Sequence, residues 1–143
     1  MNELLPALHL SATAVMTGVI WVVQLIQYPW FHRCPPDRFV TYHHQYTSRI
    51  GFIVGPTMLI EAGTGVLLYL YYDGYARDLM LFSLLVLLAI WISTALLQIP
   101  DHRLLSHGYN ETTHRRLVKF NWIRTAGWSL RLALVIAAVA ANT

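Results

Sequence analysis

The sequence predicts an all-α fold, a four-helix transmembrane bundle that forms a single domain over residues 1–143. Hydrophobic residues make up 56% of the chain and charged residues only 12%, about half the charged share of a typical soluble protein. A soluble domain of this length cannot bury that much apolar surface. Four apolar stretches each exceed the roughly 20 residues that cross a ~30 Å hydrocarbon layer.

The four stretches predict spans at about 5–29, 50–71, 79–100 and 117–141. The first has no basic residues before it, and its apolar part is too long for a secretion signal, so we expect a span there. From Asp37 to Tyr72 only Gly55-Pro56 interrupts the helical pattern, and that length of helix would measure about 54 Å. The second helix should therefore extend into the cytoplasm. The pattern predicts a returning loop at Asp101–Tyr109, with Asn110 as the N-cap of the last helix.

The basic residues predict the orientation of the chain. Apart from Arg124 and Arg131, which lie inside the fourth span, every Lys and Arg except Arg77 lies in or beside the loops after the first and third spans. The positive-inside rule puts those loops in the cytoplasm and both termini on the other side. We expect the membrane to be a bacterial inner membrane. The net charge of +3 is then a topology signal. The expected partners are a lipid bilayer, a small-molecule ligand and further copies of the chain in a homo-oligomer, but no nucleic acid.

Polar residues inside the spans are the candidates for function. Asn121, Arg124, Trp128 and Arg131 fall within an arc of about 80° on the last helix. A charged side chain in hydrocarbon is costly, so this stripe should face the bundle interior. Glu61, in the second span, is the natural counter-ion for Arg131 or Arg124. We predict catalytic roles for Glu61, Arg124 and Arg131, with a purely structural buried ion pair as the alternative.

The other spans also carry polar groups. His9 and Gln24 lie on one face of the first helix, and Gln98 lies on the third. Polar groups on all four helices indicate a shared cavity rather than one packed pair. Gln24, Gln98 and Asn121 are therefore expected to bind a cofactor or ligand, together with His9 and Arg131.

Histidine is a common metal ligand, and all the histidines except His9 lie near the loops that we place in the cytoplasm. A transition-metal site there would use His43, His44, Asp101 and His102, although their spacing matches no recognised ligand motif. His9 is alone in an apolar stretch, which leaves two interpretations: a satisfied interior histidine or an axial ligand of haem iron.

The first half of the chain carries a family resemblance in Ala7-Leu8-His9, in a first span that ends with aromatic residues and His32, and in Arg49-Ile50 and Pro56-Thr57-Met58. These residues resemble the small four-helix membrane protoporphyrinogen oxidases, which are associated with haem. The resemblance implies haem b bound at His9. The second half, with Gln98–His102 and Asn121–Thr125, resembles small bacterial integral membrane proteins without an assigned activity.

Four functions remain open. The leading one is a haem-binding or redox protein, a membrane oxidoreductase in which His9 ligates the iron, Arg131 or Arg124 neutralises a propionate, and Glu61 carries a proton. The second is a binder or transporter of a small polar or anionic ligand. The third is a membrane enzyme with a metal or with no cofactor, and the fourth is a scaffold with an ion-pair core.

Overall fold

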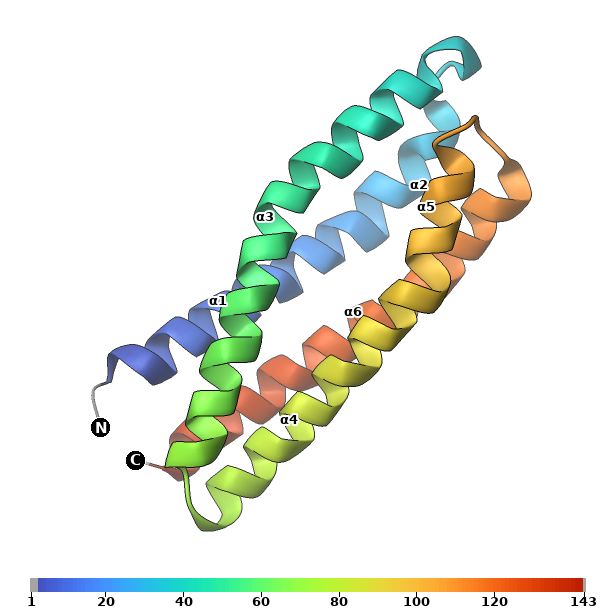
Figure 1. Ribbon diagram of the computed structural model, residues 1–143. Coiled ribbons are helices and arrows are strands. Elements are labelled where there is room, and N and C mark those ends of the chain that lie inside the picture. The colour runs from blue at the N-terminus through green and yellow to red at the C-terminus, as the bar shows by residue number, and fades with distance from the viewer. Residues whose placement is uncertain (1–2, 143) are drawn as a thin grey trace.

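The computed structural model describes residues 3–142, which form four long helical rods packed as a bundle (Figure 1). The prediction of an all-α bundle is confirmed, and each rod is long and apolar enough to cross a membrane. The first rod consists of α1 (Leu4–Val22), η1 (Val23–Gln27), α2 (Tyr28–Trp30) and η2 (Phe31–Arg33), and the second is α3 (Pro36–Tyr71). The third rod consists of α4 (Gly74–Ser93), η3 (Thr94–Gln98) and α5 (Ile99–Leu105), and the fourth is α6 (Glu111–Ala141).

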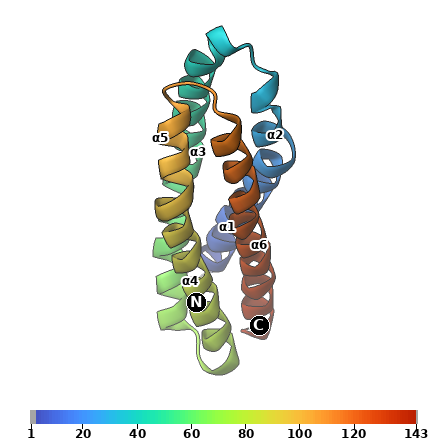
Figure 2. The same ribbon diagram turned by 90° about the vertical axis from the view of Figure 1, so that its right-hand side faces the viewer.

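The bundle has two ends of different character, which Figures 1 and 2 show from two sides. The terminal end holds the N- and C-terminal ends of the chain and the turn between α3 and α4. The basic end holds the other two connections. Five arginines lie in or next to the helix ends there: Arg33, Arg38, Arg103, Arg115 and Arg116. α6 begins at the basic end, where the Asn110 side chain accepts a hydrogen bond of 2.9 Å from the Thr113 N–H, so the predicted N-cap is confirmed.

The first and third rods continue past the prolines at which the sequence predicted their ends. Each contains a π-helical turn, η1 or η3, directly before a short α-helix with Pro29 or Pro100 in its first turn. A proline ring clashes with the carbonyl one turn earlier, but the wider π-turn shifts that carbonyl and proline is tolerated at a first helical turn. The predicted loop at Asp101–Tyr109 is therefore wrong for Asp101–Leu105, which is helical.

The four rods pack as a ring. α6 packs against α1 and α4, and α3 packs against the same two helices on the other side. α6 and α4 approach closely at Gly127, where an added Cβ would lie 2.7 Å from Ile90 Cγ1. Large apolar side chains such as Phe52 and Leu59 of α3 are exposed on the outside. Polar side chains are buried in the interior together with apolar ones such as Phe39 and Leu68, which is the arrangement expected of a bundle surrounded by lipid.

Candidate functional site

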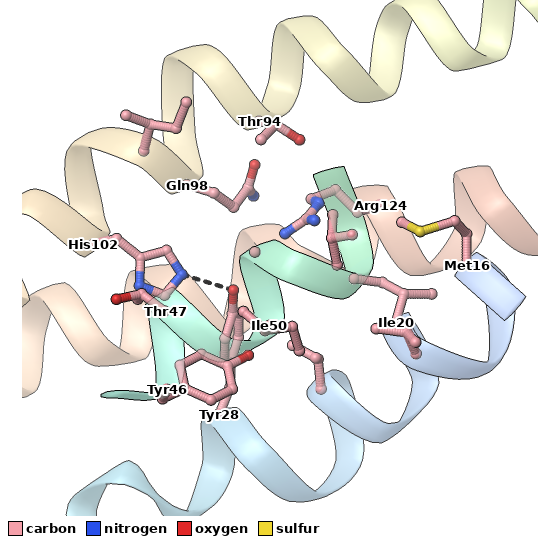
Figure 3. Close-up of a pocket in the computed structure, with 15 residues that line it drawn as sticks. Met16, Ile20, Tyr28, Tyr46, Thr47, Ile50, Thr94, Gln98, His102 and Arg124 are labelled. Atoms are coloured by element: carbon pink, nitrogen blue, oxygen red, sulfur yellow. Dashed lines mark hydrogen bonds between the residues drawn. The ribbon is translucent and has the colours of Figure 1, made fainter. Parts of the chain in front are cut away.

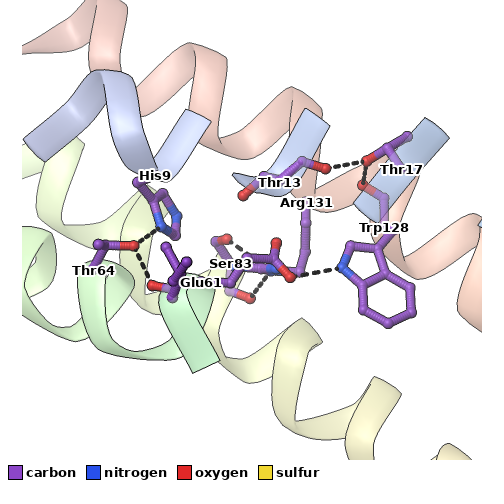
Figure 4. A network of polar contacts seen from close by, with 9 residues as sticks. His9, Thr13, Thr17, Glu61, Thr64, Ser83, Trp128 and Arg131 are labelled. Atoms are coloured by element: carbon purple, nitrogen blue, oxygen red, sulfur yellow. Dashed lines mark hydrogen bonds and ion pairs between the residues drawn. The ribbon is translucent and has the colours of Figure 1, made fainter. Parts of the chain in front are cut away.

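A buried ion pair joins α3 to α6 in the half of the bundle nearer the terminal end (Figure 4). Arg131 Nη1 lies 2.5 Å from Glu61 Oε1, and both side chains are 0% exposed. The predicted buried ion pair is present, and its cation is Arg131 rather than Arg124. Both charges leave water completely, so their mutual attraction must be supported by further hydrogen bonds.

Two residues that the sequence did not suggest as partners, Trp128 and Ser83, supply those hydrogen bonds. The Trp128 indole N–H donates to Glu61 Oε2 over 3.1 Å, so both carboxylate oxygens are used. Arg131 Nε donates to the Ser83 carbonyl over 3.1 Å, with the Ser83 hydroxyl at 3.3 Å. Glu61, Ser83, Trp128 and Arg131, which we call the ion-pair cluster, thus connect three of the four rods.

His9 lies in the same half of the bundle but bonds to a different residue. Its Nδ1 is 2.8 Å from Thr64 Oγ1, and the Thr64 hydroxyl donates to the Ile60 carbonyl over 2.6 Å. Because the Thr64 proton is used in this way, His9 Nδ1 is the donor in their hydrogen bond. His9 Nε2 has no hydrogen-bond partner among the described residues. Gly65 permits the close contact, since a Cβ there would lie 3.1 Å from His9 Cε1.

The surroundings of His9 do not fit the haem b that the resemblance implies. A haem ligand needs an open face at Nε2 for the iron and the wide, flat macrocycle around it. The His9 side chain is 0% exposed and its ring lies against Gly65. His9 also does not line the cavity described below. Haem binding stays a prediction that this geometry does not support.

A cavity of about 430 Å³ lies between the rods, nearer the basic end (Figure 3). Apolar side chains of α1 and α3 form much of its wall, among them Met16, Ile20 and Val54. Its polar groups come from all four rods: Tyr28, Tyr46, Gln98, His102 and Arg124. This volume falls in the range of about 300–1,000 Å³ that small-molecule sites occupy.

Arg124 is the charged group of this cavity. Its side chain is 8% exposed, its Nη1 donates to Asn121 Oδ1 over 3.2 Å, and its guanidinium lies over the Trp128 ring at 5.5 Å. Arg124 Nε has no partner, and no carboxylate of residues 3–142 lies within ion-pair distance of it. Trp128 therefore contacts both the Glu61 carboxylate and a second guanidinium, that of Arg124, which has no carboxylate partner.

Of the predicted binding residues Gln24, Gln98 and Asn121, only Gln98 lines the cavity, whereas Asn121 bonds to Arg124 and Gln24 bonds to Asn121. Asn121 Nδ2 donates to Gln24 Oε1 over 2.9 Å, which holds the Asn121 oxygen toward Arg124. Gln98 Oε1 accepts a hydrogen bond of 3.4 Å from Ser93, while its Nε2, on a side chain only 2% exposed, has no partner. The cavity thus contains two buried groups with unused hydrogen-bond donors, Arg124 and Gln98.

A chain of hydrogen bonds leads from the cavity toward the basic end. The Tyr28 hydroxyl is bonded to His102 Nε2 over 2.8 Å, and His102 Nδ1 is bonded to His43 Nε2 over 2.9 Å. The Tyr28 carbonyl, in addition, accepts a hydrogen bond of 2.6 Å from His114 Nε2. Tyr28 is not among the candidates that the sequence suggested, and only its contacts reveal that it faces the cavity.

The alternative metal site does not assemble. Within residues 3–142 no group of three or more His, Cys, Asp or Glu side chains is placed to hold a metal ion. His43 and His102 bond to one another, and Asp101 accepts two hydrogen bonds from Arg116. His44 is exposed and contacts His43 only through its ring edge.

Comparison with known proteins adds no assignment: no family model, no curated protein and no solved structure matches this chain. The resemblance of the first half to the membrane protoporphyrinogen oxidases stays a prediction. What the described residues do establish is a four-helix bundle with four candidate membrane spans, a buried ion pair and a cavity that holds an unpaired guanidinium.

Proposed function

We propose that this protein is an integral membrane protein that binds a small anionic ligand at Arg124. The observation that carries the proposal is the charge balance of the interior. Glu61 is fully engaged by Arg131 and Trp128, and Asp101 is engaged by Arg116, so Arg124 has no acidic partner among the described residues. An anion in the cavity would supply the missing negative charge.

The energetic reason is the cost of a lone buried charge. The Arg124 side chain is only 8% exposed, and a charged group removed from water is costly unless it is paired and hydrogen-bonded. The planar guanidinium offers a fork of N–H groups that matches a carboxylate or a similar anion. The free Gln98 amide N–H and the Tyr28 hydroxyl line the same cavity and would add hydrogen bonds to the ligand's head (Figure 3).

The ion-pair cluster takes a supporting role in this proposal. Within it, Glu61 holds the Trp128 indole by a hydrogen bond, and the Trp128 ring in turn lies beneath the Arg124 guanidinium. Glu61 and Arg131, which the sequence suggested as catalytic, therefore position Arg124 rather than contact the ligand. We keep the predicted orientation, with the basic end in the cytoplasm and both termini on the opposite side.

Calorimetric titration of the purified protein with octanoate tests the proposal, because this anion is soluble in water as well as in lipid. Octanoate should bind, and Arg124→Gln should weaken its binding by roughly tenfold or more, because a hydrogen bond to a charged group contributes about 1.5–3 kcal/mol. Lys119→Gln is the matched control: it removes one positive charge from the exposed side of α6 and should leave the affinity unchanged. Equal affinity for octanoate and octanol, or an unaffected Arg124→Gln variant, would contradict an anion site.

A further inference from the structure

We infer that the cavity takes a single-chain carboxylic acid directly from the lipid, through a side opening between Gly51 of α3 and Ile99 of α5. The inference rests on the proposed function and names the ligand class and its route. It follows from four features of the cavity: which elements line it, where it reaches the surface, how deep it lies along the bundle, and what charge it lacks.

The cavity separates α3 from the third rod at this level. Its wall is formed on one side by α3, through Tyr46, Thr47, Ile50, Gly51 and Val54, and on the other by η3 and α5, through Thr94, Gln98, Ile99 and His102. Along this stretch η3 and α5 pack against α6, whereas α3 packs against α1 and α4. Figure 3 shows Thr94 and Gln98 on one side of the cavity and Ile50 on the other.

The cavity reaches the surface at Gly51 and Ile99. Both residues line it and both are exposed, Ile99 to 50%. A Cβ added to Gly51 would meet no heavy atom within 4 Å, so the rim is open there. Both residues belong to helices long and apolar enough to cross a membrane. The opening therefore faces lipid.

The depth of the opening matches that of a lipid acid's head. Gly51 lies about 30 Å along α3 from Tyr71 at the terminal end, which is the thickness of the hydrocarbon layer. Arg124 lies about 26 Å along α6 from Ala141, slightly deeper than the opening. A carboxylate at the boundary of the layer would meet Arg124 a short distance inside the rim, with its chain still among apolar groups.

The charge and shape of the cavity select a carboxylate with an acyl tail. One unpaired guanidinium is neutralised by one negative charge, whereas a phosphate monoester would bring about 1.5–2 negative charges and leave part of them buried without a partner. Beyond the polar groups, Met16, Val19 and Ile20 of α1 continue the wall and would cover a hydrocarbon tail. Burying that tail stabilises the complex in proportion to the apolar area covered.

Uptake of radiolabelled dodecanoate from phosphatidylcholine vesicles, measured on bead-captured protein, tests the route. The variant Gly51→Cys, made in a Cys34→Ser background, would be treated with a membrane-soluble benzyl thiosulfonate. The reagent attaches a benzylthio group to the new cysteine and so blocks the opening, and a reductant then removes the group. Because block and release use the same folded protein, a folding defect cannot imitate the result. Uptake should slow at least tenfold in the blocked protein and recover on reduction.

Gly55→Cys is the matched control, one turn along α3, exposed and with equally open surroundings, but outside the cavity wall. Its modification should not change the uptake rate. Unchanged uptake by blocked Gly51→Cys would overturn the side route, and dodecyl phosphate binding more tightly than dodecanoate would overturn the carboxylate class. Either result leaves octanoate binding at Arg124 standing, whereas absence of octanoate binding in the unmodified protein would defeat the proposed function itself.

Discussion

Arg124 and Arg131 lie two turns apart on the same face of α6, and their surroundings give them different roles. Arg131 is bonded to a carboxylate, a carbonyl and a hydroxyl, all buried. Arg124 has an amide oxygen and an aromatic ring as partners, and it lines a cavity. Arg131 is therefore part of the packed interior, whereas the Arg124 guanidinium faces a cavity and is available to bind a ligand.

Glu61→Gln should destabilise the protein more than removal of the whole pair. The neutral amide leaves Arg131 buried without a counter-charge, and breaking a buried ion pair in this way costs about 3–5 kcal/mol. The double variant Glu61→Leu/Arg131→Met leaves no unpaired charge and should lose less. Thermal unfolding in detergent measures both. A Glu61→Gln variant as stable as the unmodified protein would show that the pair contributes nothing to folding.

At the scale of elements, two π-helical turns determine what reaches the cavity. η1 ends at Gln27 and η3 ends at Gln98, and in each rod the next residue but one is a proline. Each π-turn contains one more residue than an α-turn would, which rotates everything after it around the rod. Tyr28 and His102, which follow the two turns, are bonded to one another as a result.

Deleting the exposed residue Leu96 from η3 tests this account, because the shorter segment would have to form an ordinary α-turn. The Pro100 ring would then clash with the carbonyl one turn earlier, at a cost of about 3 kcal/mol. The same deletion combined with Pro100→Ala should be clearly less destabilising, as measured by thermal unfolding. If the Leu96 deletion were equally destabilising with Pro100 and with Pro100→Ala, the π-turn would have to be explained by helix packing alone.

At the scale of the whole molecule, the uneven charge of the two ends predicts how the bundle sits in the membrane. Cys34 is the only cysteine of the chain and lies in the connection between η2 and α3 at the basic end. In membrane vesicles, a membrane-impermeant maleimide should therefore label Cys34 only from the cytoplasmic side.

Asp73→Cys in a Cys34→Ser background is the matching probe for the other end, because Asp73 is exposed in the turn between α3 and α4. It should be labelled only from the side opposite to the cytoplasm. Labelling of both positions from one side would contradict a bundle that crosses the membrane, and a reversed pattern would contradict the orientation drawn from the basic residues.

The whole molecule also explains why the leading expectation of a haem ligand lacks support. His9 stands out in the sequence as a single histidine in an apolar stretch. In the bundle its donor is used by Thr64, its ring is covered at Gly65, and the open cavity lies toward the basic end. The cavity therefore forms around Arg124, a residue that the sequence ranked beside Arg131 without a means to tell them apart.

The sequence by itself determined the number of rods, their approximate bounds, and the polar stripe of α6 that contains Asn121, Arg124, Trp128 and Arg131. Those properties depend on the length of an apolar run and on helical periodicity, both of which are local along the chain. Only the tertiary structure decided that Glu61 pairs with Arg131, that Tyr28 bonds to His102, and that Ser83 completes the ion-pair cluster. Such contacts depend on how far each helix is rotated and shifted against its neighbours, and packing across the bundle sets that rotation, not periodicity within one helix.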